Sequence, residues 1–326
     1  MSSVIGFIIG RSVYICRPTA LVVRSRYRSA MTPAVLSDPA QLFSVKGLVA
    51  VVTGGATGIG LMLATALETN GATVYIVGRR TEALEKAVKE HSNHGNLIPL
   101  QGDVSSKESL RAMADIVKAR SGYVNLLINN AGVSLAHQPK LPTPSEAHGD
   151  ITQLQTPLWE TETLDSFRKT IDVNVAAVWF GTVAFMELLH EGNKRTLAAG
   201  GTGVSSQVLT ISSIAAYRKD SAVFSLSYTV SKAAVTHLGK MMAHYLKDWK
   251  IRSNVICPGL FPSEMIDEMD EAVKKVLEAS IVLKRVGTTD DMTGLVLFLA
   301  SKAGSYIDGG VLSIDGGRLV QIPTTA

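Results

Sequence analysis

The chain has 326 residues, of which 46% are hydrophobic and 18% are charged, so it can bury a large core in one domain or in two smaller ones. Its two cysteines, Cys16 and Cys257, are too few for a disulfide framework or a cysteine-rich zinc site, and no metal is expected. The formal net charge of +4 includes five arginines among the first 30 residues. The remainder, at about −1, has no evident basic face, which argues against nucleic acid as a partner.

Residues 1–30 are apolar, rich in arginine and free of acids, which is typical of a mitochondrial presequence. The run Val4–Gly10 is too short to span a bilayer, so stable membrane insertion is not expected. Alternatively, these residues are a disordered tail or an over-extended gene prediction, since Met31 opens a segment that resembles an ordinary start. We therefore expect an N-terminal extension over residues 1–45, disordered or targeting, and one domain over residues 46–320. The expected location is the cytoplasm, or the mitochondrion if residues 1–30 act as a presequence.

Short apolar runs alternate with helical patterns of 10–15 residues along the rest of the chain. The predicted strands are Leu48–Thr53, Thr73–Val77, Leu97–Gln101, Asn125–Asn129, Gln207–Ile211, Arg252–Ile256 and Val311–Ile314. The helices predicted between and after them include Thr81–Glu90, Ser106–Arg120, Leu164–Leu189, Ser231–Trp249 and Thr289–Ala300. This alternation predicts right-handed βαβ units in one doubly wound α/β domain, with a parallel sheet of about seven strands flanked by helices.

Two segments interrupt the alternation. Val133–Thr163 is rich in Pro, Thr, His and Gln, lacks clear periodicity and predicts a long loop. Pro258–Glu264 predicts a second loop, and a helical segment with an apolar face follows it to Ala279. Loops at the carboxyl edge of an open sheet often bind ligands, so both segments are expected to shape a pocket for a hydrophobic substrate. Alternatively, their apolar side chains pack on the body or on a neighbouring subunit. On the helical segment these side chains are Met265, Ile266, Met269, Val273 and Val276.

A glycine-rich turn, Thr53–Gly60, joins the first predicted strand to the helix that follows it. Glycines allow positive φ and a close approach of the backbone to a pyrophosphate, and the helix offers free N–H groups at its positive end. The turn therefore favours a dinucleotide, although a turn of this composition can also serve only to pack a helix on a strand.

Tyr228 and Lys232 are four residues apart, which places them on one face of a helix. An ammonium one turn away favours the phenolate, so we expect it to lower the pKa of Tyr228 from its usual value near 10. Such a tyrosine is an effective general acid for carbonyl reduction and a base for the reverse reaction. In isolation, the same pair is also common on helix surfaces.

The spacing Gly54-x-x-x-Gly58-x-Gly60 resembles the TGxxxGxG motif of the short-chain dehydrogenase/reductase family. The resemblance covers about residues 46–318 and continues at Asp103-Val104, Asn129-Asn-Ala-Gly132, Asn174, Ser213, Tyr228-x-x-x-Lys232 and Pro258-Gly259. It implies a Rossmann fold and hydride transfer between a nicotinamide cofactor and a ketone or secondary alcohol. It also implies a homodimer or homotetramer formed through the two long helices after the fourth and fifth strands. The phrase Leu260–Met265 resembles 3-oxoacyl reductases, which implies a β-ketoacyl or polyketide-like substrate.

The resemblance implies a catalytic set of Asn174, Ser213, Tyr228 and Lys232. In this set Ser213 binds the substrate oxygen, Lys232 also holds the nicotinamide ribose, and Asn174 holds a water linked to Lys232. Ser213 lies 15 positions before Tyr228, where the family usually has 13, so we infer a two-residue insertion between them. Ser212 is the alternative to Ser213.

The cofactor implied by the resemblance is NADP(H), because Arg79 and Arg80 follow the second strand where an acid would favour NAD. The alternative is that both arginines are solvated at the start of a helix. Ser263 stands where the family often has a threonine that bonds the nicotinamide carboxamide. A non-catalytic NADP(H)-binding sensor or scaffold is the alternative function. The full set of expected cofactor-binding residues is Gly54, Thr57, Gly58, Ile59, Gly60, Arg79, Arg80, Asp103, Val104, Asn130, Tyr228, Lys232 and Ser263.

Overall fold

The apolar runs of the sequence form a sheet of seven parallel strands in the order β3-β2-β1-β4-β5-β6-β7. The strands are β1 (Val49–Thr53), β2 (Thr73–Gly78), β3 (Leu97–Gln101), β4 (Leu126–Asn129), β5 (Gln207–Ile211), β6 (Arg252–Pro258) and β7 (Val311–Ile314). This order is that of a doubly wound Rossmann domain, and the predicted fold is confirmed.

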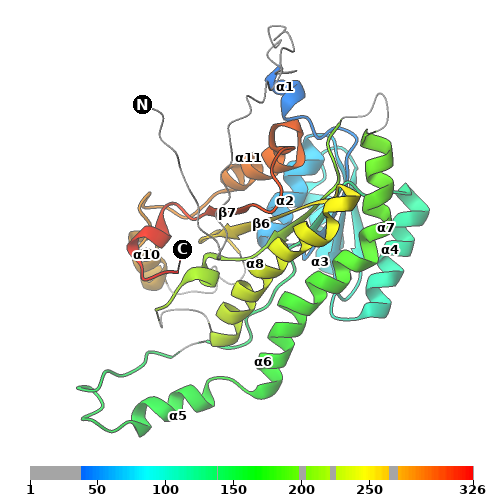
Figure 1. Cartoon of the computed structure of the whole chain (residues 1–326). Helices are drawn as coiled ribbons and strands as arrows, with labels where there is room; N and C mark the ends of the chain where they lie inside the picture. The colour runs from blue at the N-terminus through cyan, green and yellow to red at the C-terminus, as the bar shows by residue number, and fades with distance from the viewer. Residues whose placement is uncertain (1–37, 138, 198–202, 221–224, 264–270, 326) are drawn as a thin grey trace, which may run out of the picture. The chain divides into compact units, whose positions relative to one another are not determined.

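The computed structural model describes residues 38–137, 139–197, 203–220, 225–263 and 271–325, with the side chains of 271–274 left out. Residues 39–326 form one compact unit by their contacts. Figure 1 shows the sheet at the centre of this unit, with helices on both of its faces.

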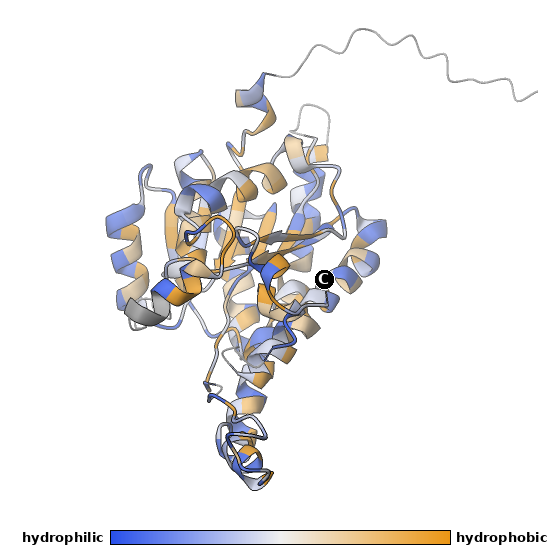
Figure 2. Cartoon of the chain, turned by 90° about the vertical axis from the view of Figure 1, so that its left-hand side faces the viewer, coloured by the Kyte–Doolittle hydropathy of each residue, from blue (hydrophilic) through white to orange (hydrophobic). Residues whose placement is uncertain are grey.

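Side chains of the central strands alternate between two cores, because successive residues of a strand point to opposite faces. On β1, Ala50 and Val52 pack toward one face with α2 (Gly58–Thr69), α3 (Thr81–His91) and α11 (Thr289–Ala300). Val49 and Val51 pack toward the other face with α4 (Lys107–Ser121), α7 (Ala177–Leu197) and α8 (Leu226–Leu246). Figure 2 shows the sheet as a hydrophobic layer, with hydrophilic residues on the outer sides of the helices.

The order of the strands reverses between β1 and β4, which are neighbours in the sheet. The chain leaves β1 toward α2 and leaves β4 in the opposite lateral direction. Connections that diverge in this way open a crevice at the carboxyl ends of the two strands, and this is where doubly wound folds bind ligands. The glycine-rich turn after β1 and the segment after β4 therefore meet at one place.

The segment Val133–Thr163, predicted as a loop, contains a helix, α5 (Thr152–Glu160). This prediction was wrong because α5 buries none of its residues and includes Pro157, so the sequence shows no apolar stripe of helical period. Figure 1 shows α5 apart from the sheet, beyond the end of α6 (Leu164–Ile171).

Three further helix boundaries differ from the prediction. α8 begins at Leu226 instead of Ser231, because the side chain of Ser225 caps its first turn. α7 continues beyond Leu189 to Leu197. A π-helical turn, η1 (Asp172–Ala176), joins α6 to α7, so that one continuous helical run is widened in its middle.

Shorter elements complete the described chain. They are α1 (Pro39–Leu42), α10 (Glu271–Ala279), and the 3₁₀ turns η2 (Ile214–Tyr217), η3 (Lys247–Trp249), η4 (Lys302–Gly304) and η5 (Arg318–Gln321). Of the predicted apolar face near α10, Val276 is 70% exposed. Met265, Ile266 and Met269 and the side chain of Val273 lie outside what the structure describes.

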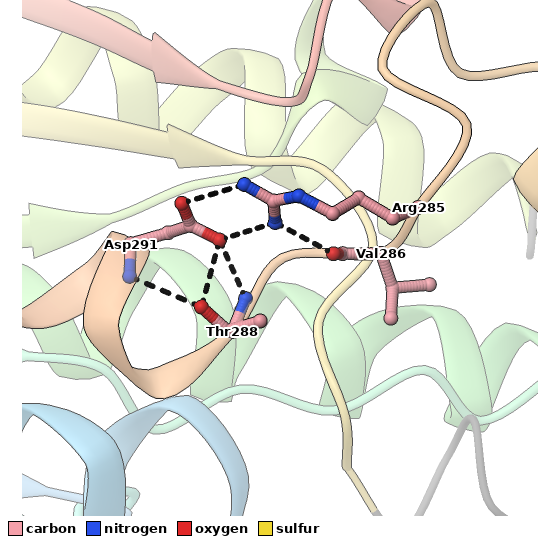
Figure 3. A network of polar contacts seen from close by, with 4 residues as sticks. All are labelled: Arg285, Val286, Thr288 and Asp291. Carbon is pink, nitrogen blue, oxygen red and sulfur yellow. Dashed lines mark hydrogen bonds and ion pairs between the residues drawn. The ribbon is translucent and has the colours of Figure 1, made fainter.

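The start of α11 is fixed by a network around one carboxylate (Figure 3). Asp291 Oδ2 accepts bonds from the N–H (2.8 Å) and the hydroxyl (2.9 Å) of Thr288, which forms a capping box with Asp291. Arg285 donates to both carboxylate oxygens, at 2.6 and 3.0 Å, and also to the carbonyl oxygen of Val286. These bonds, above all those from Arg285, hold the pKa of Asp291 well below its usual range.

The run Leu164–Leu197 has the length and apolar composition of a membrane-spanning helix, with a mean hydropathy of 1.4 in its most apolar window. Core helices of soluble proteins have the same properties, and α7 carries Phe185, Leu188 and Leu189 in the core beside the sheet. The run is therefore weak evidence for a membrane span.

The packing of α7 on the sheet gives a testable difference between two helical glycines. A Cβ on Gly192 would lie 2.1 Å from the carbonyl oxygen of Val124, whereas a Cβ on Gly294 in α11 would meet no atom within 4 Å. We expect Gly192→Ala to lower the free energy of unfolding by about 2 kcal/mol through overpacking. Gly294→Ala is the matched control and is expected to raise it by about 0.5–1 kcal/mol, because alanine favours a helix. Urea denaturation of both variants measures the difference, and equal effects would contradict the close approach of α7 to β4.

Candidate active site

The turn after β1 requires glycine at several positions. Gly54 and Gly58 have φ of +63° and +52°, in the left-handed region that glycine favours. A Cβ on Gly60 would lie 2.1 Å from the carbonyl oxygen of Gly54, so glycine at this position lets α2 approach the turn. The N-cap residue of α2, Thr57, makes no side-chain cap bond, which leaves the first N–H groups of the helix available to a ligand.

A cavity of about 480 Å³ opens beside this turn, where the connections after β1 and β4 diverge. Thr57, the N-cap of α2, and Ala83 in the first turn of α3 line it, and both helices pack on one face of the sheet. Its lining includes six of the expected cofactor-binding residues, Gly54, Thr57, Arg79, Arg80, Asp103 and Val104. The backbone of Ala131, Gly132 and Val133 closes the side toward β4.

The charges at the rim of the cavity come from β2 and β3. Arg79 and Arg80 follow β2 and are exposed, and Asp103 follows β3. Bonds from the hydroxyl (2.7 Å) and the N–H (2.9 Å) of Ser105 lower the pKa of Asp103, which therefore stays ionised. A glycine cradle, a free helix N-terminus and two guanidinium groups fit a dinucleotide with an additional phosphate.

The structure brings Tyr228, Lys232 and Ser213 together at the carboxyl end of β5. The hydroxyl of Tyr228 shares a hydrogen bond with the side chain of Ser213. Lys232 is 4% exposed, its Nζ lies 5.6 Å from the centre of the Tyr228 ring, and it donates to the carbonyl oxygen of Ile211 at 2.9 Å. Ser225, as N-cap, accepts a bond from the N–H of Tyr228 at 3.1 Å and so fixes Tyr228 in the first turn of α8.

The expected pKa of Tyr228 is corrected by the structure. We predicted that Lys232 lowers it, but burial raises the pKa of Tyr228, and only the bond with Ser213 acts in the lowering direction. Burial of the phenol is the largest cause of the rise, and the ammonium of Lys232 donates to the carbonyl oxygen of Ile211. Burial lowers the pKa of Lys232 itself, from 10.5 to about 8. Tyr228 therefore holds its proton firmly in the protein alone.

Ser212, the alternative to Ser213, has a different environment. Its hydroxyl donates to the carbonyl oxygen of Lys232 at 2.9 Å and lies 2.7 Å from the hydroxyl of Thr236. Ser212 is buried among these groups and ties α8 to β5, whereas Ser213 points its hydroxyl toward Tyr228. The geometry therefore favours Ser213 as the serine that can reach a substrate oxygen.

Asn174 occupies the widened π-helical turn, where it is 1% exposed. Its Oδ1 accepts a bond from the N–H of Val133 at 2.8 Å, and its Nδ2 donates to the carbonyl oxygen of Val133 and to Ser231, each at 2.9 Å. A Cβ on Gly132 would lie 3.3 Å from Oδ1 of Asn174 and 3.4 Å from Nζ of Lys232. The side chains of Asn174 and Lys232 therefore both lie next to Gly132, which is consistent with the predicted link between them through a water.

Three expected cofactor-binding residues lie behind or beside the cavity. Asn130 donates from Nδ2 to the carbonyl oxygens of Thr53 (2.9 Å) and Gly54 (3.1 Å), so it holds the turn in place from the β4 side. Ile59 packs partly buried against the core. Ser263 lies beside Gly58 in a neighbouring groove between α2 and α3, and its contact with the nicotinamide stays a prediction.

Three contacts at the site were not predicted from the sequence. Ser231 connects Asn174 to α8, since its hydroxyl also donates to the carbonyl oxygen of Tyr228 at 2.7 Å. Glu162, at the end of the long segment after β4, accepts bonds from the N–H and hydroxyl of Ser227. Ser225 could have been found, because a serine three residues before a helical position is a known capping signal. The other two depend on tertiary structure.

The comparison with known families is consistent with this geometry. The family model described as Enoyl-(Acyl carrier protein) reductase matches residues 54–318. The protein "Short-chain dehydrogenase/reductase PhomF" of Diaporthe leptostromiformis is 46% identical over 302 residues, which cover 91% of this chain and 99% of that protein. The chain belongs to the short-chain dehydrogenase/reductase family. It is therefore an oxidoreductase, as the sequence predicted.

A sequence and a solved structure from a bacterium are also similar. The 3-oxoacyl-(acyl-carrier-protein) reductase of rhamnolipid biosynthesis in Pseudomonas aeruginosa is 30% identical, over 84% of this chain and 97% of that protein. A solved structure titled "Pseudomonas aeruginosa RhlG/NADP active-site complex" has a TM-score of 0.73 and 30% identity, over 85% of this chain and 98% of that one. Among the residues that the structure describes, no group of three or more His, Cys, Asp or Glu side chains could hold a metal ion.

Burial of Lys232 makes the free energy of unfolding depend on pH. Its pKa is 10.5 in the unfolded chain and about 8 in the folded chain, so the unfolded chain binds the proton more tightly. The folded state therefore gains relative stability as the pH rises from about 8 to 10.5 and loses it as the pH falls through 8.

We expect Lys232→Met to unfold with a free energy up to about 3 kcal/mol above that of the wild type near neutral pH. This advantage should shrink as the pH rises toward 10.5, where Lys232 is neutral in both states. Urea denaturation at several pH values measures it, with the exposed Lys240→Met on the same helix as the control. A difference between wild type and Lys232→Met that does not change with pH would contradict the burial of an ammonium.

Proposed function

We propose that this enzyme reduces a ketone with NADP(H) and oxidises the secondary alcohol in the reverse reaction. Tyr228 serves as its general acid in the first direction and as its general base in the second. The observation that carries the proposal is the cluster of the half-buried Tyr228 and Ser213 with the buried Lys232 beside the glycine-rich turn. When bound, the nicotinamide supplies or accepts the hydride. The site does not favour a non-catalytic sensor, because binding a cofactor does not require a buried lysine next to a tyrosine.

The protein's own contribution is to deliver and hold one proton. Ser213 and the hydroxyl of Tyr228 together offer two hydrogen-bond donors to a carbonyl oxygen placed between them. Since burial raises the pKa of Tyr228, the phenol is protonated at neutral pH and ready to protonate an alkoxide that develops on the substrate. The hydrogen bond from Ser213 then favours the phenolate that is left behind.

The preference for NADP(H) rests on Arg79 and Arg80 at the rim of the cavity. Guanidinium groups pair with a 2′-phosphate, and in this position an acid would instead bind the 2′-hydroxyl of NAD. The similar structure from Pseudomonas aeruginosa is titled as an NADP complex, which agrees with this assignment.

The substrate class follows from the two segments that leave the carboxyl edge of the sheet. The segment after β4 carries Leu135, Leu158 and Trp159 with 48%, 47% and 83% of their surfaces exposed, and α10 carries the exposed Val276. Exposed apolar side chains on segments that leave the same edge of the sheet as the catalytic cluster suit a hydrophobic or acyl-type ketone. The similarity to a 3-oxoacyl reductase supports the same class.

The expected dimer or tetramer rests on the outer surfaces of α7 and α8. Phe180 and Val183 on α7 and Val230, Met241 and Tyr245 on α8 are all at least 37% exposed. Large exposed apolar side chains along two adjacent helices mark an interaction surface. A second copy of this chain presents the same surface, so we propose an isologous pairing through both helices.

The role of Tyr228 is tested by its phenylalanine variant. We expect Tyr228→Phe to reduce kcat by at least about 100-fold, because the general acid that protonates the developing alkoxide is lost. The dissociation constant for NADPH should change little. Consumption of NADPH is measured with activated ketones and β-ketoacyl thioesters, and Tyr245→Phe on the exposed side of the same helix is the control. Turnover by Tyr228→Phe at the wild-type rate would exclude Tyr228 as the proton donor.

The role of the arginines is tested by removing both. We expect the Arg79→Ala, Arg80→Ala double variant to raise the KM for NADPH by about 10- to 100-fold, because charge-assisted bonds to a phosphate are lost. The KM for NADH should change far less. Lys89→Ala, an exposed cation on α3, controls for the loss of positive charge. An equal effect on both cofactors would mean that the arginines do not recognise the 2′-phosphate.

A further inference from the structure

The C-terminal residues form a two-stranded contact with the loop that follows Ser213. The N–H of Lys219 donates to the carbonyl oxygen of Pro323 at 3.0 Å, and the N–H of Thr325 donates to the carbonyl oxygen of Tyr217 at 2.8 Å. Between these bonds, Arg218 and Thr324 face each other as an antiparallel bridge. We call residues 322–325 the C-terminal strap.

The loop held by the strap is short and directly joined to Ser213. Ser213 lies two residues after the end of β5 and is the N-cap of η2. Its Oγ accepts a bond from the N–H of Ala215 at 3.1 Å, and η2 then runs to Tyr217. Any displacement of η2 therefore moves the residue that holds the Ser213 hydroxyl. The same hydroxyl shares its hydrogen bond with Tyr228.

The loop is also fixed from the inside of the protein. The hydroxyl of Tyr217 lies 3.9 Å from Sγ of Cys257 on β6, and burial raises the pKa of Tyr217 to about 12, so the phenol stays neutral there. Arg218 forms an ion pair with Asp220 in which both side chains are largely buried, at 9% and 22% exposure. The contact of Tyr217 with Cys257 therefore anchors the loop to β6, and the ion pair fixes the loop's own conformation.

The strap in turn is anchored to the sheet through the residues after β7. Asp315 accepts bonds from the N–H groups of Gly317 (2.9 Å) and Leu319 (2.8 Å), which holds the turn η5 against the end of β7. Arg318 in η5 is 5% exposed and interacts with the charges of Arg218 and Asp220. The strap thus links β7 to the loop after β5 across β6.

We propose that the C-terminal strap is a positioning element, which holds the loop Ile214–Lys219 and thereby keeps Ser213 aligned with Tyr228 and the substrate oxygen. The proposal rests on the proposed function, because it assigns the strap a role in that same catalytic cluster. The strap bonds the loop after β5 and does not line the cofactor cavity, so cofactor binding should not depend on it.

A matched pair of proline variants separates the loss of a backbone hydrogen bond from the mere presence of a proline in the strap. Thr325→Pro removes the N–H that bonds Tyr217, whereas the N–H of Thr324 lies between the two bonds and takes part in neither. Both residues lie in extended backbone that proline tolerates at a strand edge. A chain ending at Gln321 removes the whole strap and serves as the stronger variant.

We expect Thr325→Pro and the shortened chain to reduce kcat for an activated ketone by about tenfold or more, because the catalytic serine is misplaced. Their dissociation constants for NADPH and their melting temperatures should stay close to those of the wild type. Loss of the Ser213 bond should also move the Tyr228 limb of the pH–rate profile to higher pH, since that bond lowers the pKa of Tyr228. Thr324→Pro should behave as the wild type.

Hydrogen exchange of the peptide containing Ile214–Asp220 provides a readout that does not need turnover. Faster exchange in Thr325→Pro and the shortened chain, but not in Thr324→Pro, together with the fall in kcat, would support the proposal. Unchanged exchange, or faster exchange with an unchanged kcat and pH profile, would overturn it. If the wild type itself reduces no ketone, the proposed function fails, and the role of the strap in aligning Ser213 fails with it even where exchange shows the contact.

Discussion

The hydrogen bond from the buried ammonium of Lys232 to the carbonyl oxygen of Ile211 is the interaction on which the catalytic cluster depends. It joins α8 to the end of β5, so that Tyr228 on the helix lies beside Ser213 after the strand. The ammonium is withdrawn from water, and its lowered pKa reflects the cost of that burial. The neighbouring bond from Ser212 to the carbonyl oxygen of Lys232 ties the same helix and strand a second time.

A second constraint places the cofactor cavity beside this cluster. Because β1 and β4 are neighbours, Asn130 after β4 can donate to the turn after β1 and close the crevice between them. Gly132 then passes close to both Asn174 and Lys232, where a larger side chain would meet them. The sheet order therefore brings the glycine-rich turn and the proposed proton-transfer group to one edge without a second domain.

Much of this architecture could be predicted from the sequence. Strands buried on both faces, such as β1 and β5, are continuous apolar runs that cannot be mistaken for exposed structure. Spaced glycines and the Tyr228–Lys232 pair identify the site because their chemistry needs a fixed spacing. The start of α8 was placed too late, since the residues before Ser231 lack an apolar stripe and only the cap at Ser225 marks the boundary.

What the sequence could not supply depends on contacts between distant segments. The pKa of Tyr228 was predicted to fall, because spacing alone says that an ammonium is near and not what it is bonded to. The helix α5 was missed because it buries no side chain, and burial is what creates a periodic pattern. The contact of the C-terminus with the loop after Ser213 is made through backbone groups, which leave no signature in side-chain identity.

The long segment after β4 is attached to the catalytic cluster at both of its ends. Val133 at its start is bonded on both backbone groups to Asn174, and Glu162 at its end is bonded to Ser227, next to Tyr228. The residues between these two attachments can change in length at little cost, since doubling a flexible loop costs only about 0.6 kcal/mol in closure entropy. The fold thus leaves, between two fixed attachments, a segment that can vary in length without moving the residues of the proposed proton-transfer cluster.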